Sequence, residues 1–216
     1  MSSNVREAYV YIFKLLEKYS TQDYIKIAIK KYLKDGNETL LKETEFSEEL
    51  FAVERTNAGK PYFSKFKDVG FSVSHSGEYI VCALTLGNIG VDIEQKKRLQ
   101  DEGKHEYPTR LIKIAERFFH RDEADLIKNR PETGFYEIFT AKESYVKLTG
   151  TGFDETLGEN SVLPQDDTMP SCHACMSPVR WRSKTASFWQ TLIDDYVLCI
   201  CTEEECFPQI RYCSEK

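Results

Sequence analysis

The sequence predicts an α+β fold of two similar lobes, each a small antiparallel sheet packed with helices and related to the other by a pseudo-twofold axis. Three observations predict it: helical spacing of apolar residues, short stretches of strand-like alternation, and the recurrence of helix followed by strands in both halves of the chain. A chain of 216 residues, 41% of them apolar, can bury a core in two lobes of about 100 residues each. We expect the lobes to span residues 1–95 and 96–216, with the functional site between them.

The composition narrows the class of protein. A formal net charge of −6 disfavours a general nucleic-acid binder, because such affinity comes mostly from cations that neutralise phosphates. No apolar run approaches the roughly 20 residues that cross a bilayer, and the N-terminal residues lack the pattern of a secretory signal. The seven cysteines are an odd number, scattered along the chain. We therefore expect a cytoplasmic protein with free thiols that binds neither nucleic acid nor membrane.

The first half is predicted to contain helices followed by a meander of strands. From Val5 to Leu33, apolar residues at mixed three- and four-residue spacing predict one or two amphipathic helices, the second capped by Ser20 or Thr21. Alternating patterns predict three antiparallel strands, and Gly87-Asn88 is typical of a hairpin turn between the last two. These strands are Val69 to Ser74, Tyr79 to Leu86 and Ile89 to Glu94.

The second half is predicted to repeat helices and strands around two irregular segments. Residues 95–108 are charged and indicate a connector between the lobes, whereas residues 154–178, with Gly158 and three prolines, indicate a long exposed loop. The ordered segments are a helical stripe through Ile112, Ala115 and Phe119, a helical turn near Asp122 to Ile127, a helix from Phe135 to Leu148 that ends at Gly150, and a hairpin of Ser187 to Ile193 with Tyr196 to Thr202.

Two carboxylates on the third strand form a candidate metal site. Asp92 and Glu94 are two residues apart, so both side chains project from one face while Val91 and Ile93 project from the other. Paired carboxylates suit Mg²⁺, which completes its octahedron with waters and substrate phosphates. Taken alone, the pair is better explained as charge on the solvent face of an antiparallel strand.

The helix that ends at Gly150 carries a second pair. Glu143 and Lys147 are four residues apart and lie on one face, which is also the spacing of a stabilising surface ion pair. If this face turned toward Asp92 and Glu94, Glu143 would serve as a third metal ligand or a general base, and Lys147 would neutralise charge on a departing phosphate.

A third cluster is a candidate anion site. Arg55 and the turn Gly59-Lys60-Pro61 combine positive charge with a backbone that allows close approach. Ser74 and His75 stand at a strand end nearby. Singly, each feature has a simpler explanation, because a Gly-Lys-Pro sequence is commonly a turn and a lone histidine is more often a structural hydrogen-bonding group.

One further motif contains residues that could bind a metal. Cys172-His173-Ala-Cys175 brings three soft ligands within four residues, which is a feature of zinc sites. The remaining cysteines do not form a second close pair of the usual spacing, so the sequence favours free thiols over zinc.

Taken in order, five short blocks resemble the successive motifs of the 4'-phosphopantetheinyl transferase superfamily. They lie between residues 55 and 153, nearly half of the chain. The chain length is that of the monomeric, pseudo-dimeric branch, the surfactin-synthetase-activating type, which serves nonribosomal peptide, polyketide and sometimes fatty-acid synthases. Phe139 stands where that family usually has tryptophan. The blocks are Gly59-Lys60-Pro61, Phe71-Ser-Val-Ser-His75-Ser, Ile89-Gly-Val-Asp92-Ile-Glu94, Arg117-Phe-Phe-His-Arg-Asp-Glu123 and Ala141-Lys-Glu143-Ser-Tyr-Val-Lys147-Leu-Thr-Gly150.

The resemblance implies where coenzyme A and Mg²⁺ bind. Coenzyme A would lie between the lobes, with Mg²⁺ bridging its pyrophosphate to three carboxylates, and Glu123 would stand beside this centre. Lys60 and its neighbouring backbone would hold the adenosine part, and Lys147 would contact the α-phosphate. The other implied positions are Asp92, Glu94 and Glu143 for the metal and Ser74 and His75 for the phosphates of coenzyme A.

The resemblance also implies a reaction. The serine hydroxyl of an apo acyl, peptidyl or aryl carrier protein would attack the pantetheine-bearing phosphorus in line and release 3',5'-ADP, with Mg²⁺ and Lys147 stabilising the developing charge. Either Glu143 or, less favoured, Glu123 would take the serine proton, and the sequence does not decide which. Two alternatives stay open at this point: a metal-dependent hydrolase of nucleotides or pyrophosphate, and a non-catalytic relative that binds coenzyme A or a carrier protein.

Overall fold

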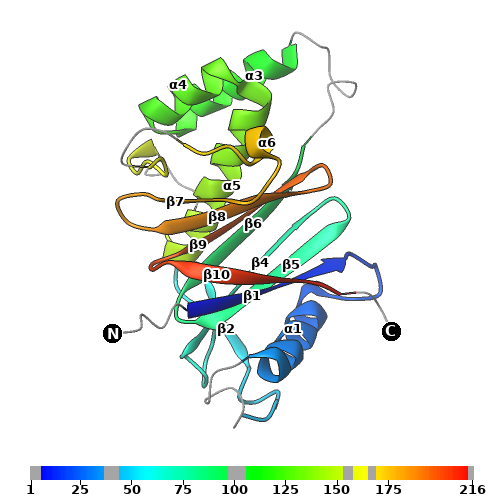
Figure 1. Ribbon diagram of the computed structural model, residues 1–216. Coiled ribbons are helices and arrows are strands. Elements are labelled where there is room, and N and C mark those ends of the chain that lie inside the picture. The colour runs from blue at the N-terminus through cyan, green and yellow to red at the C-terminus, as the bar shows by residue number, and fades with distance from the viewer. Residues whose placement is uncertain (1–5, 37–43, 97–105, 153–157, 165–168, 214–216) are drawn as a thin grey trace.

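The structure is a computed structural model that describes residues 6–36, 44–96, 106–152, 158–164 and 169–213. Two four-stranded sheets lie between helices in four layers (Figure 1). The first sheet has the order β10 (Cys206–Cys213), β1 (Arg6–Lys14), β5 (Tyr79–Leu86) and β4 (Val69–Ser76). The second has the order β6 (Ile89–Gln95), β9 (Tyr196–Thr202), β8 (Ser187–Ile193) and β7 (Val179–Arg182).

Helices cover the outer faces of both sheets. One outer layer is α1 (Thr21–Asp35), beside the small hairpin of β2 (Val53–Arg55) and β3 (Pro61–Phe63). The other contains α3 (Glu106–Phe118), α4 (Arg121–Asn129), α5 (Pro131–Thr149) and the short α6 (Cys172–Cys175). This arrangement confirms the α+β class with helices packed on sheets. The pseudo-twofold relation and the lobe boundary at 95/96 stay predictions.

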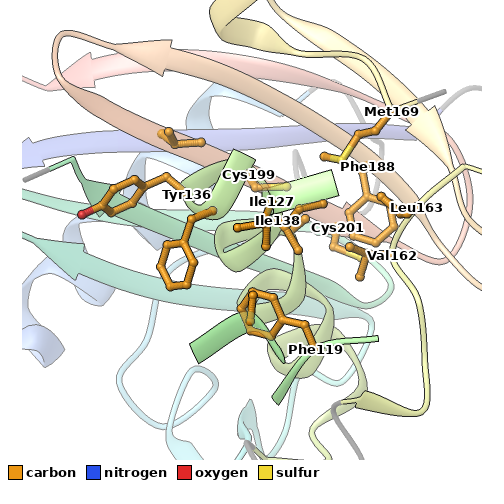
Figure 2. Close-up of a cluster of buried hydrophobic side chains, with 14 of the residues drawn as sticks. Phe119, Ile127, Tyr136, Ile138, Val162, Leu163, Met169, Phe188, Cys199 and Cys201 are labelled. Carbon is orange, nitrogen blue, oxygen red and sulfur yellow. The ribbon is translucent and has the colours of Figure 1, made fainter. Parts of the chain in front are cut away.

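Three buried clusters fill the spaces between the layers. The first joins the helices α3, α4 and α5 to the second sheet, and Phe119, Ile138 and Phe188 are among its members (Figure 2). The second joins α1 to the first sheet, and the third lies between the two sheets. Both sheets are therefore buried on both faces over much of their area, which stabilises their contact in proportion to the apolar surface removed from water.

The local predictions for α1, α5 and two hairpins are confirmed. Ser20 caps α1 through a reciprocal capping box with Asp23. The helix α5 begins at Pro131 and ends before Gly150, whose φ of 73° is the left-handed conformation that glycine favours at this position. The hairpins β4–β5 and β8–β9 pair antiparallel as expected.

The predicted helix at the start of the chain is wrong, because residues 6–14 form the strand β1. Ala8, Val10 and Ile12 pack between the sheets, whereas alternate residues such as Tyr9 and Tyr11 pack against the α1 side. Since both faces are buried, the stretch lacks the alternation of apolar with polar residues that marks a half-buried strand. Its partner β10, parallel to it, was not predicted.

The predicted three-stranded meander is also wrong in its last strand. β6 pairs antiparallel with β9 in the second sheet, so Gly87 and Asn88 lead the chain out of the first sheet instead of turning it back. The reason is burial: Val91 and Ile93 fill the core between the sheets, while the opposite face of β6 packs against α5.

The predicted connector and loop are shorter than expected. The connector lies mainly outside the described residues, and α3 already begins at Glu106, which places Pro108 in its first turn. In the described parts of 154–178, Val162 and Met169 are buried (Figure 2), and residues 172–175 form α6 (Figure 1). In the part of the chain that the structure describes, no helix has the length and apolar character needed to span a membrane.

We expect Gly90→Ala to destabilise the protein by about 1 to 3 kcal/mol, because overpacking at this contact forces backbone shifts. A Cβ at Gly90 would lie 1.9 Å from the carbonyl oxygen of Ser144 in α5. Urea unfolding measures the change. The matched control is Gly158→Ala, whose Cβ would meet its nearest atom at 3.5 Å. Equal stability of the two variants would contradict this close approach of β6 to α5.

Candidate active site

The carboxylates of β6 lie on the face that meets α5. Asp92 is 2% exposed and Glu94 is half-buried, while the intervening Ile93 packs in the core between the sheets. The two acidic side chains therefore share a face, as their spacing predicts. Because Asp92 is buried and Glu94 is partly covered, the simpler explanation of a solvent-exposed charged strand surface does not apply.

Serine side chains link the edge of β4 to the edge of β6. Ser72 accepts a hydrogen bond from the amide of Val91 at 3.0 Å, and Ser76 accepts one from the amide of Gln95 at 3.0 Å. Ser74 donates to Oδ1 of Asp92 at 2.7 Å. Ser76 also donates to Oε2 of Glu94 at 3.1 Å. The two sheets are thus joined here by a row of alternate serine hydroxyls instead of a backbone ladder.

Lys147 connects this row to α5. Its Nζ lies 2.7 Å from Oδ1 of Asp92 and 2.9 Å from Oγ of Ser74. The second oxygen of Asp92, Oδ2, is buried and has no hydrogen-bond partner among the described residues. One cation therefore neutralises a carboxylate that still has an unsatisfied acceptor.

Glu143 completes a group of three acids. It lies one turn before Lys147 on α5 and is half-buried. Burial, and next the charge of Asp92, raise the pKa of Glu94 to about 7. The same two causes raise the pKa of Glu143, and burial raises that of Asp92 against the opposing effect of Lys147. The charges of Asp92 and Glu143 disfavour the ionised form of Glu94, and the charge of Asp92 does the same for Glu143, which is the environment that a divalent cation relieves.

A cleft of 610 Å³ opens beside this group. Its walls come from the start of α1, the β2–β3 turn, β4 and the end of α5. The sequence-predicted residues that line it are Arg55, Lys60, Pro61, His75 and Lys147. Ser74 is buried behind this wall and contacts Asp92, so its hydroxyl is engaged by the carboxylate group.

Two of the cationic residues in the cleft also hold the local backbone. Arg55 donates to the carbonyl oxygen of Gly59 at 2.8 Å and thereby stabilises the β2–β3 turn. The ammonium of Lys60 donates to the carbonyl oxygen of Leu148 at the end of α5, and burial lowers its pKa. The stem and backbone of Lys60 are the parts left to line the cleft.

Glu123 belongs to a different environment from the three acids. It is fully buried in the capping box of α4, where Oε2 lies 2.7 Å from Nζ of Lys142. Its oxygens also accept hydrogen bonds from the amides of His120 at 2.9 Å and Val162 at 2.8 Å. Each oxygen thus has two protein donors, which is the pattern of a structural ion pair.

Sequence reasoning missed several residues that shape the site. Thr21 and Gln22 line the cleft from the first turn of α1, and nothing in their sequence context indicates this. Ser72 and Ser76 were detectable in principle, because they alternate with Ser74 along one strand and must share its face.

Comparison with known proteins points to one family. The sequence model of the 4'-phosphopantetheinyl transferase superfamily matches residues 88–201, more than half of the chain, including β6 and α5. A 4'-phosphopantetheinyl transferase of Bacillus subtilis is 38% identical over 113 residues, which are 50% of this chain and 46% of the relative. The transferase psf-1 of Bacillus pumilus is 30% identical over 151 residues, which are 63% and 60% of the two chains.

A third similar protein is also a 4'-phosphopantetheinyl transferase. The 4'-phosphopantetheinyl transferase gsp of Aneurinibacillus migulanus is 36% identical over 98 residues, 44% of this chain and 36% of the relative. The chain spans about half the length of the curated relatives it matches.

We expect Glu123→Gln to destabilise the protein by about 3 kcal/mol, because it leaves the Lys142 ammonium buried without a counter-charge. The double variant Glu123→Leu/Lys142→Met should recover most of this loss, since no charge is then left unpaired. Urea unfolding of the wild type, the Glu123→Gln variant and the double variant measures both the loss and the recovery. Asp125→Asn, in an exposed pair with Lys128, is the control and should change stability by less than about 1 kcal/mol. A Glu123→Gln protein as stable as the wild type would contradict the structural ion pair.

Proposed function

Because this chain belongs to the 4'-phosphopantetheinyl transferase superfamily, we propose that it transfers the 4'-phosphopantetheine group of coenzyme A to a serine of an apo carrier protein. The reaction releases 3',5'-ADP and leaves an acyl, peptidyl or aryl carrier protein in its holo form. The observation that carries the proposal is the position of Lys147, which lines the large cleft and pairs with Asp92 of the acidic group.

Coenzyme A is proposed to occupy the cleft of 610 Å³. Arg55, His75 and Lys147 line its walls with the positive and hydrogen-bonding groups that a phosphate-rich ligand requires, and Lys60 adds its stem and backbone. Pro61 fixes the turn that carries two of them. Lys147 lines the cleft and also pairs with Asp92 of the acidic group. The nucleotide part of coenzyme A could therefore lie in the cleft while its diphosphate reaches the acidic group.

Asp92, Glu94 and Glu143 are the residues that would hold Mg²⁺. Support comes from the unpartnered, buried Oδ2 of Asp92 and from the repulsion among the three carboxylates. When bound, Mg²⁺ would supply Lewis-acid stabilisation of the phosphate oxygens. Ser74 and Ser76 orient Asp92 and Glu94 through their hydroxyl groups.

The proposed chemistry is an in-line displacement at the pantetheine-bearing phosphorus. The carrier serine oxygen forms the new bond to phosphorus, the bond to the 3',5'-ADP oxygen breaks, and the serine proton passes to a carboxylate. Glu143 is the favoured acceptor, because both oxygens of Glu123 are engaged by Lys142 and backbone amides. Lys147 is proposed to stabilise the charge on the departing phosphate through its ammonium group.

The remaining parts of the proposal concern partners and location. We propose a cytoplasmic monomer that serves carrier proteins of nonribosomal peptide, polyketide or fatty-acid synthases, as the family resemblance implies. Nucleic acid and membrane are not proposed as partners, since the net charge of −6 offers no general phosphate-binding surface.

Asp92→Ala and Glu143→Ala should each lower transfer by about 100-fold or more, because each removes charge on which the transition state depends. The assay incubates the protein with coenzyme A, Mg²⁺ and apo carrier protein and records the mass gain of one phosphopantetheine group on the carrier. Asp125→Ala, at an exposed position of α4, is the acidic control and should retain activity.

The same assay separates the alternative functions. A hydrolase would release 3',5'-ADP without carrier protein, and a non-catalytic binder would give neither product nor mass gain. Normal turnover by Asp92→Ala would contradict the proposed site, whatever the outcome with other variants.

Lys147→Met should destabilise the metal-free protein by about 1 to 3 kcal/mol, because Asp92 loses its charged hydrogen-bond partner. Mg²⁺ should then stabilise the variant more than the wild type, since the ion takes over the neutralisation of Asp92. Thermal unfolding with and without Mg²⁺ measures both effects. Lys26→Met, which breaks an exposed pair with Glu48, is the matched control. A variant whose stability does not respond to Mg²⁺ would count against the assigned metal ligands.

A further inference from the structure

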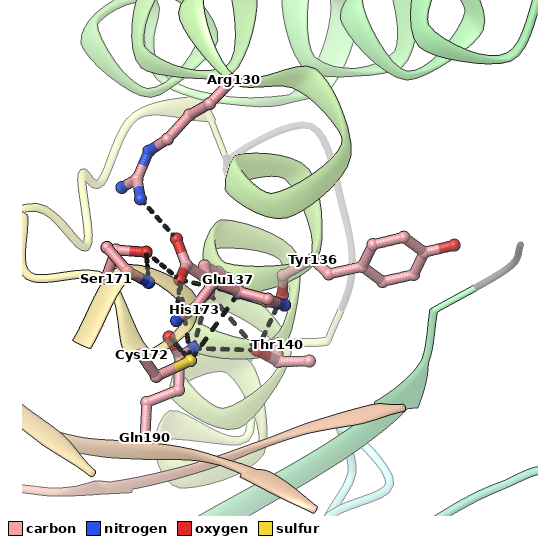
Figure 3. Close-up of polar contacts among 9 residues, drawn as sticks. Arg130, Tyr136, Glu137, Thr140, Ser171, Cys172, His173 and Gln190 are labelled. Carbon is pink, nitrogen blue, oxygen red and sulfur yellow. Dashed lines mark hydrogen bonds and ion pairs between the residues drawn. The ribbon is translucent and has the colours of Figure 1, made fainter. Parts of the chain in front are cut away.

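A second cluster of metal-ligating atoms lies on α5, away from the three acids described above. It contains Glu137 of α5 and the neighbouring Cys172 and His173 of α6 (Figure 3). Glu137 and Cys172 are fully buried, and the side chain of His173 is 11% exposed. Cys175, the second cysteine of the sequence motif, is exposed and is not a member of this cluster.

The three donor atoms have the spacing of ligands around one ion. Oε1 of Glu137 is 2.9 Å from Nδ1 of His173 and 3.6 Å from Sγ of Cys172, and the sulfur is 3.9 Å from the same nitrogen. Bond lengths of about 2.0 to 2.3 Å around a tetrahedral zinc ion place neighbouring ligands about 3.3 to 3.6 Å apart. Small movements of the side chains therefore give a coordination tetrahedron.

Hydrogen bonding alone leaves Oε1 of Glu137 with too many donors. Besides the thiol and the imidazole, the hydroxyl of Ser171 lies at 2.6 Å and the amide of His173 at 3.2 Å. A carboxylate oxygen has two lone pairs, so it cannot accept from all four groups at good geometry. If Nδ1 is instead unprotonated, two acceptor atoms face each other at 2.9 Å. A cation between these atoms replaces the thiol and imidazole donors with one ligand bond to Oε1, and it removes the contact between two acceptors.

Groups around the cluster provide a fourth donor and fix the carboxylate. Gln190 of β8 is fully buried, and its Nε2 donates to the carbonyl oxygen of Glu137 at 2.8 Å and to Thr140 at 3.1 Å. This orientation turns its Oε1 toward the cluster, 3.7 Å from Sγ of Cys172 (Figure 3). Arg130 pairs with the other oxygen of Glu137 at 2.8 Å, which leaves Oε1 to face the ion.

We propose that Glu137, Cys172 and His173 bind one zinc-class cation through Oε1, Sγ and Nδ1, with Oε1 of Gln190 in the fourth position. Binding replaces the thiol proton of Cys172, so one thiolate and one carboxylate balance the two charges of the ion. All four positions come from the protein, which is the composition of a structural site. The ion would tie α6 and β8 to α5, six residues before Glu143.

The test is cobalt substitution in the full chain. The protein is stripped with a chelator and titrated with Co²⁺, and a thiolate-to-cobalt charge-transfer band with tetrahedral visible bands is expected at one equivalent. Zn²⁺ should displace the Co²⁺ and raise the melting temperature. Cys172→Ser should abolish the charge-transfer band, and Glu137→Gln should weaken binding by about tenfold or more.

Two control variants make the result specific. Cys175→Ser removes the exposed cysteine of the same segment and should bind as the wild type does. Asp92→Ala should also keep the band, which separates this cluster from the proposed Mg²⁺ ligands, so that a failure of the transfer reaction does not affect the outcome. If Cys172→Ser does not fold, His173→Asn serves in its place. A spectrum without the charge-transfer band, or equal binding by the wild type and Cys172→Ser, would overturn the proposal.

Discussion

The ion pair between Asp92 and Lys147 is the constraint on which the site depends. A carboxylate that is almost fully buried would be strongly unfavourable without a counter-charge. Lys147 supplies that charge from α5, and Ser74 supplies a hydrogen bond from β4, so three elements must meet at one point. The contacts of Ser74, Asp92 and Lys147 therefore fix how the two sheets and α5 are placed relative to one another. Asp92 and Lys147 are also proposed to act on the reacting phosphates.

The seam between β4 and β6 explains how two sheets bring their acidic and cationic groups together. If β6 had continued the first sheet, its backbone would pair with a strand there and Asp92 would have no contact with α5. Instead, β6 pairs with β9, and the serine hydroxyls of β4 satisfy amides along its free edge. The edge is thereby covered without a ladder, which leaves the side chains of β6 free to face the helix.

Local sequence signals predict α1, α5 and the hairpins β4–β5 and β8–β9, because the information for each lies within one segment. The terminal glycine of α5 and the turn between β8 and β9 are examples of this kind. The strand β6 was predicted but its partner was not, because β9 lies far away in the sequence. β1 was predicted as a helix and β10 was missed, because these two strands pair across the length of the chain and burial on both faces removes the alternation of β1.

The same distinction applies to the candidate site. Spacing along one strand and one helix paired Asp92 with Glu94 and Glu143 with Lys147, and the structure brings these two pairs together. The engagement of Glu123 by Lys142, and the meeting of Glu137 with Cys172 and His173, depend on how separate segments pack against each other. The spacing of residues within one segment cannot predict such contacts between segments.

The parallel pairing of β10 with β1 has a consequence for how the protein forms in the cell. During synthesis, β1 leaves the ribosome before its two partner strands. β5 can then pair with one edge of β1, but the other edge has no partner until residues 206–213 have been synthesised. Throughout that interval a nascent chain exposes a strand rich in tyrosine and aliphatic residues, which favours association with other chains. Premature termination within the last strand would thus produce a species prone to aggregation, even though every residue of the acidic group had already been synthesised.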